Sequence, residues 1–208
     1  MQIKIFQVGD IDTNCYIVFD EKESTGVVID PGAESGIISD FINLKKISVK
    51  YVLLTHGHYD HAAEAAALSE ICNCPVYIHK DDLKVYKMFA PLIKSISKRE
   101  LFEDFLFYSE NQIFKVSEDI ELKAFSTPGH SPGGVCFELS KYKILFTGDT
   151  IFYGTYGRTD LRGGNEKDII NSLKKIISGY GGYKIFPGHG RDSTIEFEKE
   201  NNDFLSLL

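Results

Sequence analysis

The chain has 208 residues, of which 43% are hydrophobic and 25% are charged, and these proportions are typical of a globular protein with a substantial core. A net charge of −7 and the lack of any dense lysine or arginine block argue against a nucleic-acid partner. The N-terminus lacks the charged and apolar regions of a secretory signal, and no apolar run approaches membrane-spanning length. We therefore expect one domain over residues 1–208, located in the cytoplasm and without a membrane partner.

The first part of the chain predicts a three-stranded meander followed by alternating helices and strands. Short runs rich in β-branched and aromatic residues are separated by turn residues, which is typical of strands. Later segments carry apolar residues at helical spacing or are rich in alanine. The predicted strands span residues 2–8, 14–19, 26–30, 51–55 and 75–79, and the predicted helices span residues 35–46 and about 60–71.

Residues 80–115 are the least regular part of the sequence and form an aromatic-rich insertion. Two interpretations remain open at this point. The segment could form two short amphipathic helices that pack on the body, or it could form an aromatic lid over a site, because loops often carry substrate contacts. The same aromatic content would also permit a homo-oligomer interface.

The second part of the chain returns to strands and ends in helices. Predicted strands span residues 120–126, 134–139, 143–147 and 183–186, and predicted helices span residues 166–178 and a segment that starts near Thr194. A glycine-rich loop occupies residues 154–164. Strands and helices in this order predict a layered α/β fold.

A cluster of metal-competent side chains follows the predicted strand at 51–55. His56, His58 and Asp60 share parity, so their side chains point to one side while the chain stays extended. Asp60 is a candidate cap for the helix that follows, which would turn His61 back beside it. This arrangement suits two adjacent cations better than one.

Three further motifs place a histidine or a carboxylate directly after glycine at the end of a predicted strand. These residues are His130, Asp149 and His189. Side chains delivered from one edge of the sheets are a common arrangement for a binding site. The sixth histidine, His79, stands outside the motifs and is interpreted as structural or exposed. The cysteines match no zinc or redox spacing and are interpreted as buried thiols.

The ligand types predict two metal ions with open coordination positions. Imidazole and carboxylate without thiolate suit Zn²⁺ first, with Fe²⁺ or Mn²⁺ as alternatives. We assign metal one to His56, His58 and His130, metal two to Asp60, His61 and His189, and a bridging position to Asp149. Two metals about 3.5–4 Å apart would hold a bridging hydroxide as nucleophile, which Asp60 could also orient. Asp60 and Asp149 are therefore the predicted catalytic residues.

Two more residues have open roles. Asp30 ends the third predicted strand, where it could support a metal ligand or could simply form a turn. Arg158 lies in the glycine-flanked loop after Asp149. It could bind a substrate carboxylate through two hydrogen bonds, or it could pair with Asp160 and stiffen the loop.

Together these motifs resemble the metallo-β-lactamase superfamily. The run from His56 to His61 matches its His-x-His-x-Asp-His signature, and Asp30, His130, Asp149 and His189 match its other motif positions in order. The resemblance implies a four-layer αββα sandwich. The loops at 147–152 and 157–161 further resemble the glyoxalase II-like hydrolases, although the chain ends without the C-terminal helical domain that grips glutathione in glyoxalase II. The resemblance thus implies a two-metal hydrolase of S-lactoylglutathione or another small acyl-thiol.

Other functions of similar families remain as alternatives. A persulfide dioxygenase would hold a single iron at the equivalents of His56, His130 and Asp149. RNA cleavage is disfavoured by the acidic charge, and a scaffold without catalysis is disfavoured because no ligand is missing. Hydrolysis of β-lactams is disfavoured by His61 and by the lack of an export signal.

Overall fold

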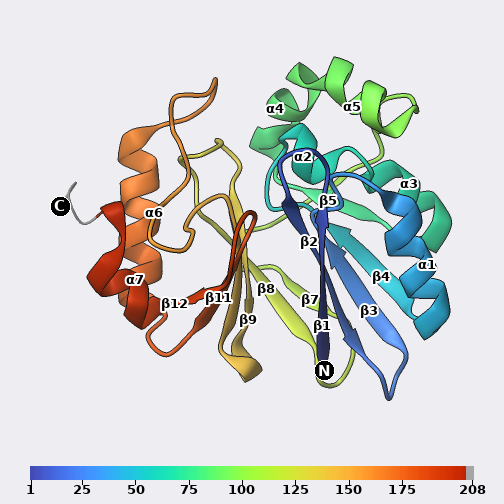
Figure 1. Cartoon of the computed structure of the whole chain (residues 1–208), viewed down its shortest axis with the longest axis horizontal. Coiled ribbons are helices and arrows are strands. Elements are labelled where there is room, and N and C mark those ends of the chain that lie inside the picture. Colours follow the sequence, from blue (N-terminus) through green and yellow to red (C-terminus); the bar gives the residue numbers. More distant parts are fainter. Residues whose placement is uncertain (205–208) are drawn as a thin grey trace.

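The computed structural model describes residues 1–204 as two six-stranded mixed sheets that lie face to face between outer helices (Figure 1). The first sheet has the strand order β1-β2-β3-β4-β5-β6, and the second has the order β12-β11-β10-β9-β8-β7. Helices α1 and α3 cover the outer face of the first sheet, and α6 and α7 cover that of the second. The fold is therefore the αββα sandwich that the sequence predicts.

The strands of the first sheet are β1 (Gln2–Val8), β2 (Thr13–Asp20), β3 (Thr25–Ile29), β4 (Ser48–Leu53), β5 (Val76–Ile78) and β6 (Leu106–Phe107). Those of the second are β7 (Ile113–Lys115), β8 (Glu121–Ser126), β9 (Val135–Leu139), β10 (Ile144–Gly148), β11 (Lys184–Pro187) and β12 (Ser193–Thr194). The α-helices are α1 (Ser35–Lys45), α2 (Tyr59–Ala62), α3 (Ala65–Cys72), α4 (Leu83–Met88), α5 (Ala90–Ser97), α6 (Glu166–Gly179) and α7 (Ile195–Asn201). Short 3₁₀ turns span Lys80–Asp82 and Ser140–Tyr142.

The layers follow from strands that are apolar on both faces. In β3, Val27 and Ile29 lie in the core between the two sheets, whereas Val28 lies in the core beneath α1 and α3. In β10, Phe146 faces the first sheet and Leu145 faces α6. Successive side chains of a strand point to opposite faces, so each sheet buries both faces and needs cover on both.

The predicted helix at about 60–71 is wrong in one respect, because the structure divides it into α2 and α3. The backbone N–H of Glu64 donates to the carbonyl of Pro31, 2.9 Å away, and not to a carbonyl of its own helix. The turn that contains Gly32 lies so close that a Cβ at Gly32 would fall 1.3 Å from the Asp60 carbonyl oxygen. The approach of this turn thus replaces the helical hydrogen bond and interrupts the helix.

The prediction that Asp60 caps this helix is also wrong. His58 occupies the N-cap position of α2, and Asp60 lies inside its first turn. The Asp60 carboxylate is therefore free of the helix backbone and turns toward His61, whose Nε2 lies 3.2 Å from its Oδ2. The predicted strand at 51–55 is likewise shifted, because the backbone of Thr55 bonds to the Asp30 side chain and β4 ends at Leu53.

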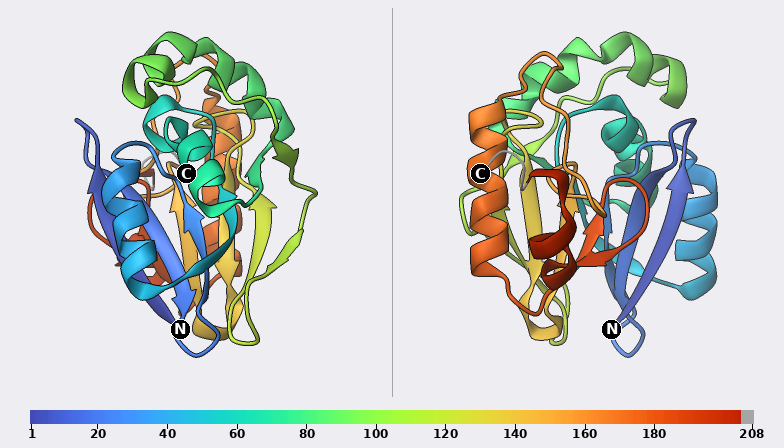
Figure 2. Two further views of the ribbon diagram at one scale, coloured as in Figure 1. Left: turned by 90° about the vertical axis from the view of Figure 1, so that its right-hand side faces the viewer. Right: turned by 60° about the vertical axis from the view of Figure 1, so that its left-hand side comes forward.

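The segment at 80–115 crosses the end of the sandwich where β4 and β10 terminate. It contains the helices α4 and α5, which Figure 2 shows lying over that end of the molecule. It also contains β6 and β7, which add edge strands to the two sheets and which the sequence did not predict because they have only two and three residues. No helix within residues 1–204 is long and apolar enough to cross a membrane.

Candidate metal centre

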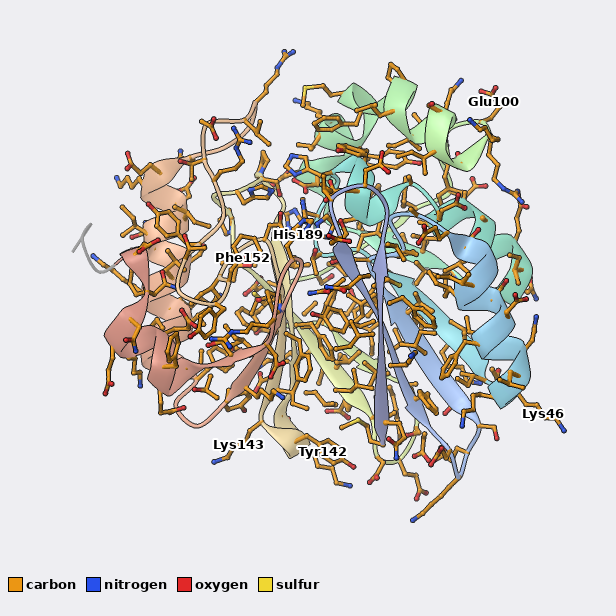
Figure 3. The ribbon with its side chains drawn as sticks, in the orientation of Figure 1. Lys46, Glu100, Tyr142, Lys143, Phe152 and His189 are labelled. Atoms are coloured by element: carbon orange, nitrogen blue, oxygen red, sulfur yellow. The ribbon has the colours of Figure 1, made fainter. Side chains whose placement is uncertain are left out.

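Seven side chains converge at the end of the sandwich from loops that follow four different strands. The loops follow β4, β8, β10 and β11, and Figure 3 shows the labelled His189 between the two halves of the fold. The converging residues are His56, His58, Asp60, His61, His130, Asp149 and His189. The structure therefore brings together every residue that the sequence predicts as a metal ligand.

The first group consists of three buried histidines, His56, His58 and His130. One nitrogen from each ring lies within 4.8 Å of the others, and the ring centroids are 4.6–4.9 Å apart. The Nε2 atom of His130 lies 2.9 Å from Nδ1 of His58. Three imidazole nitrogens facing a common point are a typical ligand set for one metal ion.

The second group consists of Asp60, His61 and His189, whose ligand atoms also lie within 4.8 Å of one another. The Nε2 atoms of His61 and His189 each lie 3.2 Å from Oδ2 of Asp60. This group is more open than the first, because the side chain of His189 is 26% exposed. It matches the set that the sequence assigns to metal two.

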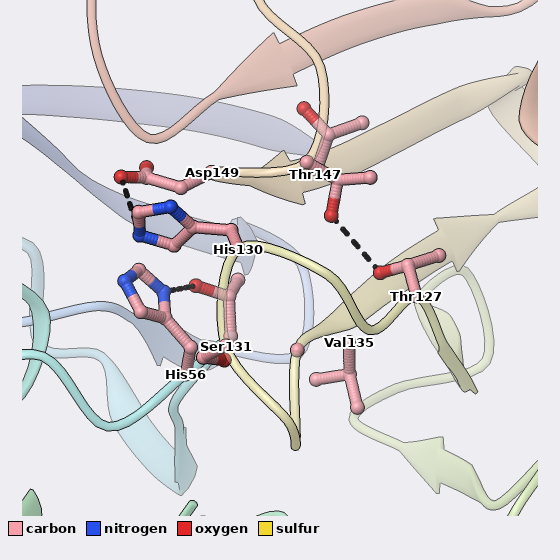
Figure 4. A pocket seen from close by; sticks show the side chains of 10 residues that line it. His56, Thr127, His130, Ser131, Val135, Thr147 and Asp149 are labelled. Atoms are coloured by element: carbon pink, nitrogen blue, oxygen red, sulfur yellow. Dashed lines mark hydrogen bonds and ion pairs between the residues drawn. The ribbon is translucent and has the colours of Figure 1, made fainter. Parts of the chain in front are cut away.

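Asp149 lies between the two groups. Its Oδ1 is 3.4 Å from Nε2 of His61, and its Oδ2 is 3.4 Å from Nε2 of His130 and 3.7 Å from Nε2 of His189. Figure 4 shows the Asp149 carboxylate beside the ring of His130, with the His56 ring next to it. One carboxylate that faces both groups is placed to bridge two metal ions.

Several of these atoms lack partners that a buried polar atom normally has. The Nε2 atoms of His56, His58 and His61 and the Oδ1 atom of Asp149 are buried and form no hydrogen bond. Buried polar atoms are nearly always hydrogen-bonded, so orphans concentrated at one point indicate a missing partner. Nitrogen and carboxylate oxygen donors without thiolate fit Zn²⁺, Fe²⁺ or Mn²⁺. The residues present therefore fit bound metal ions.

Burial sets the protonation of His56 and His58. It lowers the pKa of His56 well below its usual value and lowers the pKa of His58 to about 4. Neighbouring histidines lower both values further. Both rings are thus neutral near pH 7, which leaves their lone pairs available for a metal ion.

In the second group, the pKa values are set mainly by the attraction between carboxylates and histidines. Burial alone would raise the pKa of Asp60 and of Asp149, but His61 lowers both below the usual value. Burial would lower the pKa of His61, but Asp60, Asp149 and Asp30 together raise it. Carboxylates and imidazoles in the second group therefore stabilise each other's charged forms, and a metal ion would take the place of the proton.

Asp30 contacts His61, a predicted ligand, and does not merely form a turn. Its carboxylate accepts hydrogen bonds from the backbone N–H and the hydroxyl of Thr55, both at 2.7 Å, and lies 3.0 Å from Nδ1 of His61. The bond to Nδ1 turns the opposite nitrogen of His61 toward Asp60 and Asp149. Such contacts fix the tautomer and orientation of a metal-binding histidine.

Backbone carbonyls orient two other ligands. Nδ1 of His130 lies 2.8 Å from the Arg158 carbonyl oxygen, and Nδ1 of His189 lies 3.0 Å from the Ile11 carbonyl oxygen. Both contacts fix the ring so that Nε2 faces the centre. The sequence did not predict these contacts, because every residue has a backbone carbonyl and the residue type does not show which one accepts a hydrogen bond.

The side chain of Arg158 pairs with Asp160, which is one of the two roles that the sequence suggests for it. Its Nε and Nη2 atoms donate to the two carboxylate oxygens of Asp160, each at 2.6 Å. Both side chains are more than 60% exposed. The pair stiffens the loop whose backbone holds His130, while the guanidinium stays at the surface.

Asp82 is a buried residue of the site that the sequence analysis missed. It accepts hydrogen bonds from the backbone N–H of Gly57 at 2.7 Å, from the N–H of Gly133 at 2.6 Å and from the hydroxyl of Ser131 at 2.8 Å. Asp82 thus connects the loop that carries His56 and His58 with the loop that follows His130. His79, which lies outside the ligand motifs of the sequence, takes no part in the ligand groups. It accepts a hydrogen bond from the backbone N–H of Asp81.

The junction between α4 and α5 covers one side of the first group. The ring of Phe89 lies with its centroid 5.2 Å from that of His58 and 5.6 Å from that of Tyr59. Phe89 thus shields His58 from solvent, so at least one residue of the aromatic insertion acts as part of a cover.

Comparisons with known proteins agree with this geometry. The family model described as "Metallo-beta-lactamase superfamily" matches residues 8–189. The chain is 31% identical to a hydroxyacylglutathione hydrolase, GloC, of Haemophilus influenzae over 99% of both chains. Two solved structures have a TM-score of 0.84 at 29% identity. One is titled BLEG-1 B3 metallo-beta-lactamase and covers 99% of this chain and 100% of its own. The other is titled TTHA1623 in a di-iron-bound form and covers 97% and 99%.

Proposed function

Because this chain belongs to the metallo-beta-lactamase superfamily, we propose that it is a two-metal hydrolase that cleaves small acyl-thiol thioesters. Two complete ligand groups that share Asp149 support this proposal most strongly. The whole-length similarity to a hydroxyacylglutathione hydrolase supports the choice of thioesters among the possible bonds. When bound, two divalent cations would polarise the thioester carbonyl and supply a hydroxide nucleophile near neutral pH.

The residues of the chain would position the reactants and accept protons. Asp60 accepts a hydrogen bond from the hydroxyl of Thr13 at 3.1 Å, which fixes Oδ2, the carboxylate oxygen that faces His61 and His189. Its pKa lies below the usual value because of His61 and His189, although burial opposes this. Asp60 is therefore ionised near neutral pH and is able to orient an attacking water through a hydrogen bond.

We assign the acyl group to a hollow beside Asp60. A hollow of about 420 Å³ borders Asp60 and is lined in part by Ile11, Tyr59 and Ile96. Its walls mix apolar and polar side chains, and a small acyl chain is the part of a thioester that such a hollow accommodates.

The test is hydrolysis of S-lactoylglutathione and other acyl-thiols by the wild type and by His130→Ala and Asp149→Ala variants. We expect each variant to lose at least about 100-fold in kcat/KM, because removal of even a supporting residue of a metal ligand commonly costs 10- to 100-fold. Thioester cleavage that survives both substitutions would contradict the assignment.

Two further substrates distinguish the alternatives. Oxygen consumption with glutathione persulfide by protein holding one iron would favour a persulfide dioxygenase, although the intact group of Asp60, His61 and His189 favours two metals. The similarity to a protein titled B3 metallo-beta-lactamase makes a chromogenic cephalosporin a necessary second substrate. Faster cleavage of the cephalosporin than of any thioester would replace the proposed substrate class.

A further inference from the structure

A groove with a cationic lining lies beside the first ligand group, outside the metal centre itself. It has a volume of about 1030 Å³ and runs between the segment that begins α4 and the loops at 132 and 162–163. Its charged residues are Lys80, Lys84, Lys87, Arg162 and Asp81. We call these residues and the space between them the cationic groove.

The charge of this groove contrasts with that of the whole chain. Four cations and one carboxylate give the groove a local charge of +3, although the chain carries −7. Within residues 1–204, none of the four cations forms an ion pair or a hydrogen bond, and the one acid lies 3.8 Å from His79. By comparison, Lys94 and Arg99, which lie further along the same insertion, are paired with Glu100 and Glu70. The groove thus concentrates positive charge that the protein itself leaves unneutralised.

The groove lies against the loops that carry the first ligand group. Its wall at residues 80–82 is anchored by the buried Asp82 carboxylate, which bonds to the backbone of Gly57 and of Gly133. Pro132 lines the groove and follows His130 by two residues, so their Cα atoms are at most about 7.6 Å apart. The groove therefore borders the loop that carries His130.

We propose that the cationic groove binds the phosphate groups of a polyphosphorylated thiol of the coenzyme A type, whose acyl thioester extends to the metal centre. Lysine and arginine bind phosphate oxygens through charge-assisted hydrogen bonds. A thiol with a diphosphate and a phosphate monoester carries a charge of about −4 at pH 7, which matches four unpaired cations. Glutathione, with a net charge of about −1, would leave most of this charge unbalanced. This inference rests on the proposed thioesterase function and specifies its thiol.

The groove can be tested without catalysis by calorimetric titration with desulfo-coenzyme A, which keeps the phosphates but has no thiol to ligate a metal. We expect one binding site per chain, with an affinity that falls as ionic strength rises. The Lys84→Glu/Arg162→Glu variant should weaken binding by about tenfold or more, since two charge-assisted contacts become repulsive. Lys45→Glu/Lys174→Glu, which makes the same change in net charge at two exposed positions outside the groove, is the matched control and should leave binding unchanged. No saturable binding, or equal affinity in all three proteins, would refute the proposal.

A kinetic comparison then separates this inference from the proposed function. One acyl group is attached to coenzyme A, to glutathione and to the neutral thiol N-acetylcysteamine, and each is assayed with the same three proteins. We expect the double variant to raise KM about tenfold for the coenzyme A thioester alone, with kcat little changed, because only that thiol carries phosphates. A larger KM effect on the glutathione thioester would overturn the choice of thiol. Binding of desulfo-coenzyme A without cleavage of any thioester would reject the thioesterase and leave the groove assignment standing.

Discussion

The two ligand groups of the metal centre differ in how deeply they lie and in what holds them. His56, His58 and His130 are at most 6% exposed, and the α4–α5 junction covers them through Phe89. In the second group, the side chains of Asp60 and His189 are 11% and 26% exposed. Burial also lowers the pKa of His56 and of His58, whereas the second group combines a carboxylate with imidazoles.

The hydrogen bonds that hold the two groups in place also differ. Asp82 joins the loops of the first group, and the Arg158 carbonyl holds the ring of His130. In the second group, His189 bonds to the carbonyl of Ile11, which belongs to the turn between β1 and β2. The first group is thus enclosed throughout, whereas the second is open at Asp60 and His189 and buried at His61. We infer that metal one has mainly a binding and polarising role, and that metal two faces the solvent from which water enters.

The strongest test of this comparison removes one ligand from each group. We expect His58→Ala and His189→Ala each to reduce the metal content to about one per chain and to lower kcat/KM by at least about 100-fold. The remaining metal should be bound more tightly in His189→Ala, because that variant keeps the enclosed site. Elemental analysis after dialysis measures both quantities. Equal retention of the remaining metal would remove the proposed difference between the sites.

A second test substitutes the carboxylate that supports the second group. Asp30→Asn should weaken metal two by about 10- to 100-fold, because the amide is a poorer acceptor for the Nδ1 proton of His61. Competition with a metal-binding dye would resolve the two sites, and metal one should keep its wild-type affinity. Loss of both metals together would mean that Asp30 supports the whole centre and not one half of it.

The corresponding test for the first group uses Asp82→Asn. The substitution leaves at least one buried N–H or hydroxyl without its acceptor, which should lower the free energy of unfolding by about 1–3 kcal/mol. The affinity of metal one should fall more than that of metal two. Denaturant unfolding of the apo-protein and dye competition on the metal-loaded protein measure these effects separately. Asp81→Asn, on the exposed neighbour, is the matched control and should change neither.

Removal of the metals tests whether the two groups differ in solvent access, and it needs no substitution. A chelator added to the metal-loaded protein should remove the two ions in separate phases, with the ion at the more exposed His189 leaving first. Release followed by a chelator dye measures the rates. A single phase for both ions would contradict the distinction between an open and an enclosed site.

The smallest effect is expected for Arg158→Ala. The ion pair with Asp160 is exposed, and exposed pairs contribute little to stability, so the thermal midpoint should hardly change. The Arg158 carbonyl that holds His130 remains in the variant. A large rise in KM for a substrate that carries a carboxylate would instead establish the first of the two predicted roles for this side chain.

The sequence predicted the ligand set because four ligands lie in the short run from His56 to His61 and the other three each follow a glycine after a strand, and both patterns are local. The order of strands and helices predicted a layered α/β fold, and the resemblance of the ligand motifs to a known family implied the four-layer sandwich. Prediction from the sequence failed where tertiary contacts override local preference. The approach of the turn at Gly32 divides the expected helix and removes Asp60 from the capping position.

Asp82 shows most clearly what the sequence alone could not predict. It stands beside Asp81 in the sequence, and nothing in residue type or spacing separates the two. The structure leaves Asp81 exposed and buries Asp82 completely among three donors. Only the packing of residues 80–82 between two ligand loops decides which carboxylate supports the centre.

The most direct test of the central claim is the metal content of purified wild-type protein, measured on the same sample as its thioester hydrolysis. We predict about two divalent metal ions per chain together with cleavage of an acyl-thiol thioester, both lost after chelation and restored when metal is returned. One iron per chain with no thioester cleavage would contradict the account.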